Sequence, residues 1–444
     1  MFITRRSFCS NTALALLSPR LLRAQTQDQR QAQRQAQTQA QNQAQPRALP
    51  GAASAHADVA AIDHDRILSA AQRYLTQTPT PLTAFPAPNS PGTPHDFYSE
   101  DHEEKPPVVT APNAPAPPPE PVHFTAHSDA LLNLSIQVCT LVAAFVLTKE
   151  ERYAEHAAAH LRAWFVTPAT SMIPALPFAQ LTPGTTTPRL EGILETVQLV
   201  EVAQAISFLP RSEALSDEEL AAVYAWFATY LEWLGTDRTA LLARDQKNHH
   251  GTSWLLQAAA FARLAPEDSG GARKVPAPAP SQALAPPPNQ YIGLNALRHQ
   301  YKSVTLRAQV TALGTFTHEL TTPWPYRFSL FNLDMLSGIC DLLSTRFESM
   351  WDYELQDDPS MRVAIAYHFP FIAHRGTWPY RADITHFTEL PLRQPSLLLS
   401  GRAYSRPEYV DLWKTLPPDP TDPALQRTFP IRQPLLWIRR APAM

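Results

Sequence analysis

Apolar residues recur at three- and four-residue intervals along most of the chain, which is the spacing of one buried face of an α-helix. Two such runs, 129–147 and 150–165, are joined by only a couple of residues, so we expect them to pack antiparallel as a helical hairpin. Ser216 and Glu219 have the spacing of a capping box ahead of another apolar run. Further helices are predicted at 191–209, 251–264, 291–312, 329–345 and 357–373. Alternating residues bounded by hairpin turns do not compete with them, so the predicted fold class is all-α.

The first residues have the pattern of an export signal. Arg5 and Arg6 precede a moderately apolar run, and 1–24 resembles a bacterial twin-arginine leader. An ordinary secretory signal whose charged region contains two arginines is the alternative. We expect a periplasmic or secreted protein, without a further apolar run that approaches the length of a membrane span.

Three other segments have compositions that do not build a packed core. Residues 25–58 are rich in Gln and Ala and are expected to form a disordered tether. Proline-rich segments occupy 80–122 and 270–288, and the second is predicted to be a surface loop between two helices. The remaining sequence predicts one domain over 59–440.

The net charge, the cysteines and the motifs narrow the classes of protein and reaction to consider. A formal net charge of −3 over 444 residues is not the concentrated positive charge of a nucleic-acid binder. Cys139 and Cys340 lie in apolar helical runs, so two buried thiols are expected rather than a disulfide. His123 and His127 have a spacing that can hold zinc, but no nearby glutamate completes the metalloprotease pattern. The sequence contains no phosphate-binding glycine loop or nucleophile elbow, and we predict a reaction without metal or cofactor.

The stretch 244–262 places polar residues at the start of an apolar helix. Asn248, His249 and His250 come directly before the apolar stripe. Because the first N–H groups of a helix lack helical partners and favour anions, this position suits an acidic substrate. The alternative is that Asn248 caps the helix and the two histidines are solvated.

Four segments resemble the alginate lyase family, in the same order along the chain. Asn248, His250, Gly251 and Thr252 match its Asn-Asn-His-Gly-Thr signature, with His249 where the second asparagine is expected. The other segments are Trp164-Phe165-Val166 with Pro168-Ala169-Thr170 and Met172, Ser329-Leu330-Phe331-Asn332-Leu333-Asp334, and Arg393-Gln394-Pro395-Ser396-Leu397-Leu398. The resemblance covers roughly residues 123–416. It implies an incomplete α/α toroid of antiparallel helical hairpins, and a lyase that cuts a uronate-containing polysaccharide such as alginate by β-elimination.

This reaction needs a group that neutralises the uronate carboxylate, a base for the proton on carbon 5 and an acid for the departing oxygen. The resemblance makes His250 the base. His249 takes the place of the carboxylate-binding asparagine, and Asn248 either supplies that amide or caps the helix. The family's tyrosine falls at Phe328, which has no proton to transfer. We therefore predict that Tyr326 is the acid, in a segment where two prolines are expected to prevent a regular helix.

Five side chains are candidates for binding an anionic sugar. Arg327 supplies a permanent cation beside the aromatic cluster, although Trp324, Tyr326 and Phe328 can instead pack the core. Arg393 is expected either to meet the sugar or to form an ion pair with Asp383 or Glu389. The predicted substrate-binding residues are Arg327, Arg189, Gln180, Trp324 and Arg393.

Two other functions stay open on the sequence. A catalytically inactive glycan-binding protein of the same fold would keep the cleft and lose the proton-transfer groups, as Phe328 hints. A glycoside hydrolase on the same architecture would need two carboxylates flanking the scissile bond. Its candidates are Glu195, Asp245 and Asp334, which are not paired in a recognisable motif.

Overall fold

The computed structural model describes residues 57–101, 123–182, 184–264, 292–356 and 359–438. The expected leader at 1–24, nearly all of the expected tether at 25–58 and the proline-rich segment at 270–288 lie outside the described residues. So does the part of the first proline-rich segment from 102 to 122.

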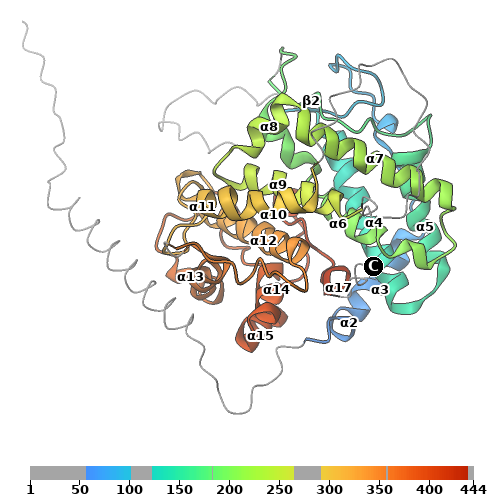
Figure 1. Ribbon diagram of the computed structural model, residues 1–444. Helices are drawn as coiled ribbons and strands as arrows, with labels where there is room; N and C mark the ends of the chain where they lie inside the picture. Colours follow the sequence, from blue (N-terminus) through green and yellow to red (C-terminus); the bar gives the residue numbers. More distant parts are fainter. Residues whose placement is uncertain (1–56, 102–122, 183, 265–291, 357–358, 439–444) are drawn as a thin grey trace, which may run out of the picture.

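The described chain is predominantly helical (Figure 1). Its α-helices are α2 (Val59–Ile62), α3 (His64–Tyr74), α4 (Ala126–Thr148), α5 (Glu151–Leu161), α6 (Leu199–Ile206), α7 (Asp217–Thr236), α8 (Arg238–Arg244), α9 (His249–Ala262), α10 (Leu294–Gln300), α11 (Leu306–Gln309), α12 (Pro325–Leu343), α13 (Met361–Ala373), α14 (Pro395–Ala403), α15 (Pro407–Thr415), α16 (Pro423–Arg427) and α17 (Pro434–Ile438). Short 3₁₀ turns are η1 (Leu82–Ala84), η3 (Leu190–Thr196), η4 (Leu209–Arg211), η6 (Glu319–Thr321) and η7 (Arg375–Thr377), and π turns are η2 (Arg162–Val166) and η5 (Tyr301–Thr305).

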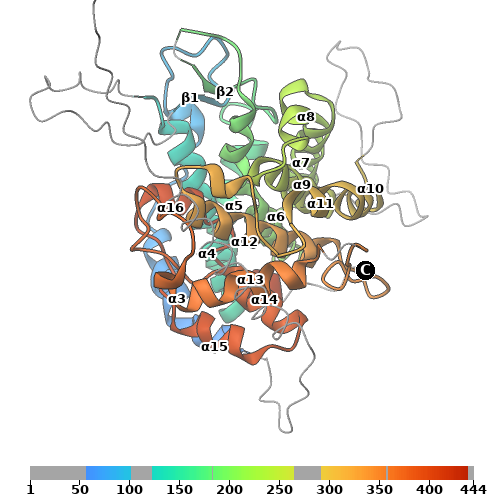
Figure 2. The ribbon, with the colours of Figure 1, turned by 90° about the vertical axis from the view of Figure 1, so that its left-hand side faces the viewer.

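Successive helices pack side by side in a continuous series. The series runs from α3 through α4, α6, α9 and α12 to α14, and α5, α7, α13 and α15 pack against it (Figure 1). Figure 2 shows α3 near α15 and α16, so the beginning and end of the series lie together. Two ion pairs support this proximity, Arg66 with Asp419 at 2.9 Å and Arg393 with Asp63 at 2.7 Å. The arrangement is the all-α toroid that the sequence predicts.

Local sequence signals account for several of these elements. The predicted hairpin is α4 packed on α5, and Lys149 between them adopts a left-handed conformation with φ 64°. Ser216 and Glu219 make both bonds of the predicted capping box at the start of α7. Cys139 in α4 and Cys340 in α12 are both buried free thiols, as predicted.

Two of the described helical segments are long and apolar enough to cross a membrane, which corrects the expectation that no such run follows the leader. They are α4, with a mean hydropathy of 2.1, and the segment Leu190–Arg211, with a mean hydropathy of 1.3. Their most apolar windows are 78% and 89% buried inside the protein. Both therefore have the burial of core helices.

The structure also contains a short two-stranded parallel sheet, which the sequence analysis did not predict. Strand β1 (Tyr98–Glu100) pairs with β2 (Phe178–Leu181), and the pairing shifts register within β1. In β2, Gln180 has a positive φ of 55°. All of β1 is buried and only one residue of β2 is not, so neither strand shows the alternation by which half-buried strands are recognised.

A buried carboxylate fixes the C-terminal part of the chain to the core. Glu201 in α6 accepts main-chain N–H bonds from Arg432 at 2.9 Å and Gln433 at 2.7 Å. The side chain of Trp437 in α17 donates to the same oxygen at 3.3 Å. Burial raises the pKa of Glu201, and these bonds act against that shift.

Candidate active site

The first residues of α9 bring two histidine rings together. Asn248 is the N-cap, and its Oδ1 accepts from the main-chain N–H of His250 at 3.1 Å. The same oxygen lies 3.0 Å from Nδ1 of His250. Because an amide oxygen only accepts, Nδ1 of His250 carries the hydrogen and the lone pair of the neutral ring is at Nε2. The predicted cap and the predicted functional cluster are therefore the same residues.

A carboxylate that the sequence analysis missed holds the second ring. Glu319 in η6 is completely buried. Its Oε1 accepts the main-chain N–H of His249 at 2.6 Å, and its Oε2 lies 2.8 Å from Nδ1 of His249. A carboxylate only accepts, so Nδ1 of His249 also carries a hydrogen.

The two rings have different electrostatic surroundings. Their centroids are 4.3 Å apart. Burial lowers the pKa of His250 well below its usual value, and the positive charges of His249 and Arg189 lower it further. His250 is thus a neutral imidazole near pH 7, while His249 faces the carboxylate of Glu319. Neither Nε2 atom has a bonding partner among the described residues, and neither is among the completely enclosed polar atoms.

Gln309, Asn332 and Gly251 support this helix start. Gln309 in α11 donates through Nε2 to the main-chain oxygen of Asn248 at 2.9 Å. Asn332, in the Ser-Leu-Phe-Asn-Leu-Asp segment of α12, donates to Oε1 of Gln309 at 3.1 Å. Gly251 is required because a Cβ there would lie only 2.2 Å from the main-chain oxygen of Gln246. These contacts fix the backbone that carries both histidines.

The aromatic segment differs from its predicted role. Phe328 is partly exposed, and its ring centroid is 4.5 Å from that of His249. Tyr326 is completely buried, and its hydroxyl donates to the main-chain oxygen of Phe371 at 3.0 Å. A hydroxyl in that position cannot reach the leaving oxygen of a polymer, so the structure contradicts the acid role predicted for Tyr326. Trp324 is also buried, and its Nε1 donates to Oγ1 of Thr385 at 2.9 Å, which corrects the expectation that it binds sugar.

The way α12 begins explains why Tyr326 lies in the core. Pro325 is the first residue of the helix, where its missing N–H is harmless and its fixed φ is favourable. The expectation that two prolines prevent a regular helix here was wrong for that reason. Asp383 accepts the main-chain N–H groups of Tyr326 at 2.8 Å and Arg327 at 2.9 Å, and burial raises its pKa to about 6. The regular first turn directs Tyr326 into the core.

Arg327 is buried in the same turn. Its guanidinium carbon lies 5.1 Å from the ring centroid of Trp324 and 5.4 Å from that of Phe328. It also borders a small hollow between α12 and the segment that leads into α14. Its charge is therefore buried beside the aromatic ring that faces His249, rather than on an open surface.

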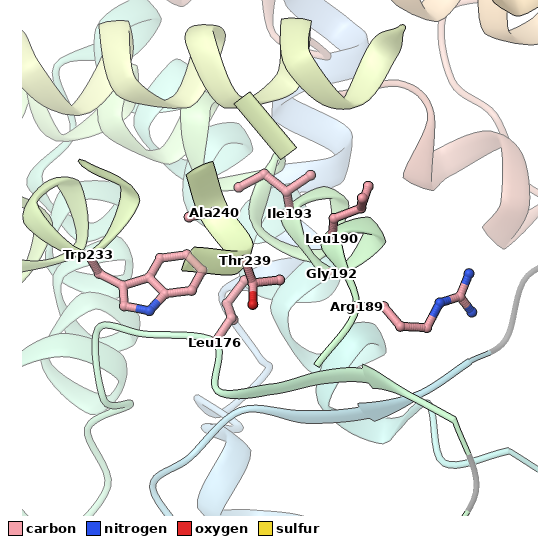
Figure 3. A pocket seen from close by; sticks show the side chains of 8 residues that line it. All are labelled: Leu176, Arg189, Leu190, Gly192, Ile193, Trp233, Thr239 and Ala240. Atoms are coloured by element: carbon pink, nitrogen blue, oxygen red, sulfur yellow. The ribbon is translucent and has the colours of Figure 1, made fainter. Parts of the chain in front are cut away.

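Arg189 and Gln180 lie beside the short sheet. Arg189 precedes η3 and forms ion pairs with Asp101 at 2.5 Å and Glu191 at 3.2 Å. It borders a hollow lined mainly by apolar residues, and Figure 3 shows its side chain extending away from Trp233 and Leu176. Gln180 is buried and donates to Oε1 of Glu195 at 2.5 Å. Of these two predicted residues, Arg189 is the one whose charge lowers the pKa of His250.

Arg393 has a structural position. Its Nη1 binds the buried carboxylate of Asp63, and its guanidinium lies 4.7 Å from the ring centroid of Trp413. The ion pair anticipated as the alternative is present, but its partner is Asp63 rather than Asp383 or Glu389. Because this pair joins the segment that leads into α14 to the start of α3, the substrate-binding role predicted for Arg393 does not fit.

The carboxylates considered for a hydrolase have separate surroundings. Glu195 accepts from Ser99 at 2.8 Å as well as from Gln180. Asp245 forms an ion pair with the adjacent Arg244. Asp334 is completely buried and accepts the main-chain N–H of Ser396 at 3.1 Å. Their contacts do not assemble two of them around a common space.

Of the two histidines considered for zinc, His127 has both ring nitrogens engaged. Nδ1 of His127 accepts from the main-chain N–H of Tyr98 at 3.0 Å, and its Nε2 lies 2.8 Å from the main-chain oxygen of Phe85. Among the described residues, no three His, Cys, Asp or Glu side chains gather as a possible metal site.

Comparison with known proteins identifies the family of the chain. The family model described as Alginate lyase matches residues 82–378, more than half of the chain. The chain belongs to the alginate lyase family. It is a polysaccharide lyase by that membership. Comparison with curated proteins gave no match.

A solved alginate lyase structure shares the fold of this family member. An alginate lyase from Bacteroides ovatus is 21% identical, with a TM-score of 0.66 over 84% of this chain and 94% of that chain. Alginate lyase A1-III from Sphingomonas species A1 is 12% identical, with a TM-score of 0.47 over 84% of this chain and 94% of that chain.

Proposed function

We propose that the protein cleaves a uronate-containing polysaccharide such as alginate by β-elimination, with His250 as the base and His249 as the group that binds the uronate carboxylate. The observation that supports this most is the pair of imidazoles at the start of α9. Each has its Nδ1 fixed by a different partner, an amide oxygen for His250 and a carboxylate for His249. Two neighbouring imidazoles with different partners are suited to different roles.

The reaction needs two proton transfers. The imidazolium of His249 neutralises the carboxylate on carbon 5, which makes the carbon-bound hydrogen more acidic. Nε2 of His250 takes the proton from carbon 5, a double bond forms between carbons 4 and 5, and the bond from carbon 4 to the glycosidic oxygen breaks. The protonated His250 then gives that proton to the departing oxygen and returns to its neutral state.

The double role of His250 follows from the aromatic segment. Tyr326 is buried, and Phe328, which faces His249, has no hydroxyl. One imidazole can serve both transfers only where the carbon 5 hydrogen and the carbon 4 oxygen lie on the same face of the sugar ring. Mannuronate and glucuronate have this arrangement and guluronate does not, so we propose a substrate rich in the former two.

Arg189 is the proposed second cation for the anionic chain. Its side chain is 27% exposed, and its charge contributes to the lowered pKa of His250. Its ion pairs with Asp101 and Glu191 hold the guanidinium near the short sheet. Export to the periplasm or outside the cell, on the basis of the twin-arginine-like residues at the start of the sequence, is part of the same proposal.

The proposal is tested with a panel of polyuronates rich in mannuronate, glucuronate or guluronate, and a neutral polysaccharide as control. Elimination creates a conjugated double bond, so ultraviolet absorbance should rise with the first two polymers. Mass spectrometry should find unsaturated ends. Saturated products would indicate a hydrolase. Binding of the polymers without products would indicate an inactive glycan-binding protein.

A further inference from the structure

We infer that Glu319 is a positioning residue that holds His249 as a cationic ligand for the substrate carboxylate. The inference rests on the proposed function, because it explains how a histidine works at this position. It concerns a residue in η6, 70 positions away from His249 along the chain.

The geometry fixes the ring relative to the helix. One carboxylate receives both the main-chain N–H of His249, at 2.6 Å, and the ring Nδ1, at 2.8 Å. The ring of His249 cannot rotate without breaking its bond to Glu319. The same carboxylate is bonded to the main chain in the first turn of α9, so it cannot follow the ring. The rings of Phe328 and Phe331 lie 4.5 and 5.8 Å from His249 and limit its remaining freedom. Nε2 is the ring nitrogen left for a substrate.

Glu319 is itself held in place. Its main-chain N–H donates to the oxygen of Phe316 at 3.0 Å, and its main-chain oxygen accepts from Oγ1 of Thr322 at 2.8 Å. Its side chain has no exposed surface. The ring of His249 is therefore bonded to a rigid carboxylate rather than to a mobile surface group.

The buried carboxylate of Glu319 is paired with the ring of His249. A buried carboxylate is costly unless a cation is paired with it, and in the part of the chain that the structure describes Glu319 pairs with His249. Arg189 lowers the pKa of the adjacent His250, and the guanidinium carbon of Arg327 lies 5.4 Å from the ring centroid of Phe328. Glu319 thus favours a proton on both nitrogens of His249. The resulting Nε2–H can donate to a uronate carboxylate with a full positive charge behind it, where an asparagine would offer a neutral amide.

The test is a double-mutant cycle in the full chain, with Glu319→Gln, His249→Asn and both together. Glutamine keeps the size of the side chain and one acceptor oxygen but removes the charge. Glu319→Gln should lower kcat/KM on a mannuronate-rich polymer about 10- to 100-fold, as expected for a weakened hydrogen bond to a charged group. In the His249→Asn background, adding Glu319→Gln should change kcat/KM little, because asparagine does not need the carboxylate. Equal losses in both backgrounds would overturn the inference, since Glu319 would then act independently of His249.

A second measurement does not depend on turnover. Nitrogen NMR of ¹⁵N-histidine-labelled protein distinguishes a protonated from an unprotonated ring nitrogen. We expect both nitrogens of His249 to be protonated near pH 7 in the wild type, and Nε2 to lose its proton there in Glu319→Gln. A neutral His249 in the wild type would overturn the inference. A doubly protonated His249 in a protein that produces no unsaturated ends would instead show that the proposed elimination has failed, while the carboxylate still fixes the charge.

Glu201→Gln is the matched control. It also replaces a buried, main-chain-bonded glutamate, but one that binds Arg432 and Gln433 far from the start of α9 in sequence. Its loss of stability shows what removal of a buried carboxylate does alone. It should leave the NMR signals of His249 unchanged. A change equal to that of Glu319→Gln would show that the effect is a general loss of structure.

Discussion

Replacing Tyr326 with phenylalanine separates a core residue from a catalytic one. The hydroxyl of Tyr326 is completely buried and donates to the main-chain oxygen of Phe371 at 3.0 Å. Its ring packs against Trp378 and Phe387, with centroids 5.1 and 5.4 Å away. Tyr326→Phe keeps the ring contacts and leaves one buried carbonyl without this donor. The expected cost is about 1–3 kcal/mol of unfolding free energy, with turnover changed less than about twofold.

The assay measures both quantities on the same sample. Urea unfolding followed by tryptophan fluorescence gives the free energy, and ultraviolet absorbance gives the rate of elimination. Phe328→Tyr is the companion variant because its ring faces His249 and is partly exposed. We expect it to change the rate of elimination more than Tyr326→Phe does. A loss of turnover greater than tenfold in Tyr326→Phe, with stability unchanged, would refute the reasoning and restore the acid role.

Three other predictions follow from the site and the core. Gly251→Ala should lower stability by about 1–3 kcal/mol and elimination more than tenfold, since its Cβ would meet a main-chain oxygen at 2.2 Å; thermal unfolding and initial rates check this, and a fully active, stable variant contradicts it. The pH profile of kcat/KM should stay level from pH 8 to about 6.5 and fall only at lower pH, because the lowered pKa of His250 keeps the base neutral; an acidic limb above pH 7 contradicts it. Burial lowers the pKa of His368 to about 4, so the unfolded state takes up its proton at a higher pH than the folded state does. The free energy of unfolding should therefore fall by up to about 3 kcal/mol from pH 6.5 to pH 4. Urea midpoints should depend less on pH in His368→Phe than in the wild type, and an identical dependence contradicts this.

Most of the fold follows from local patterns in the sequence. The apolar spacing predicts the hairpin of α4 and α5, and the residues Ser216 and Glu219 predict the start of α7, because both signals act within a few residues. The predicted helix 291–312 is instead α10, a π turn and α11, which differ by local backbone adjustments that apolar spacing does not report. The start of α12 was misplaced because proline was read as a helix breaker, although it is well tolerated at the first position.

The candidate site could be predicted only in part. Asn248, His249 and His250 are adjacent in sequence, so their motif places them together. Glu319 lies 70 positions beyond His249 in a segment without periodicity or a motif, and only the packing of η6 against the start of α9 makes it a partner. Arg393 illustrates the same limit, because its partner Asp63 is 330 positions away while nearer acidic residues were expected. Ion-pair partners across a toroid depend on closure of the chain, which local sequence does not encode.

The most direct test of the proposed elimination is ultraviolet absorbance of a mannuronate-rich polymer incubated with the wild type and with His250→Ala. The wild type should produce a steady rise, with unsaturated ends confirmed by mass spectrometry. His250→Ala should reduce the rate by about 10²–10⁴-fold, the contribution of a general base, while retaining a cooperative unfolding transition. Elimination by His250→Ala at the wild-type rate would contradict the assignment of the base and with it the proposed roles of the two histidines.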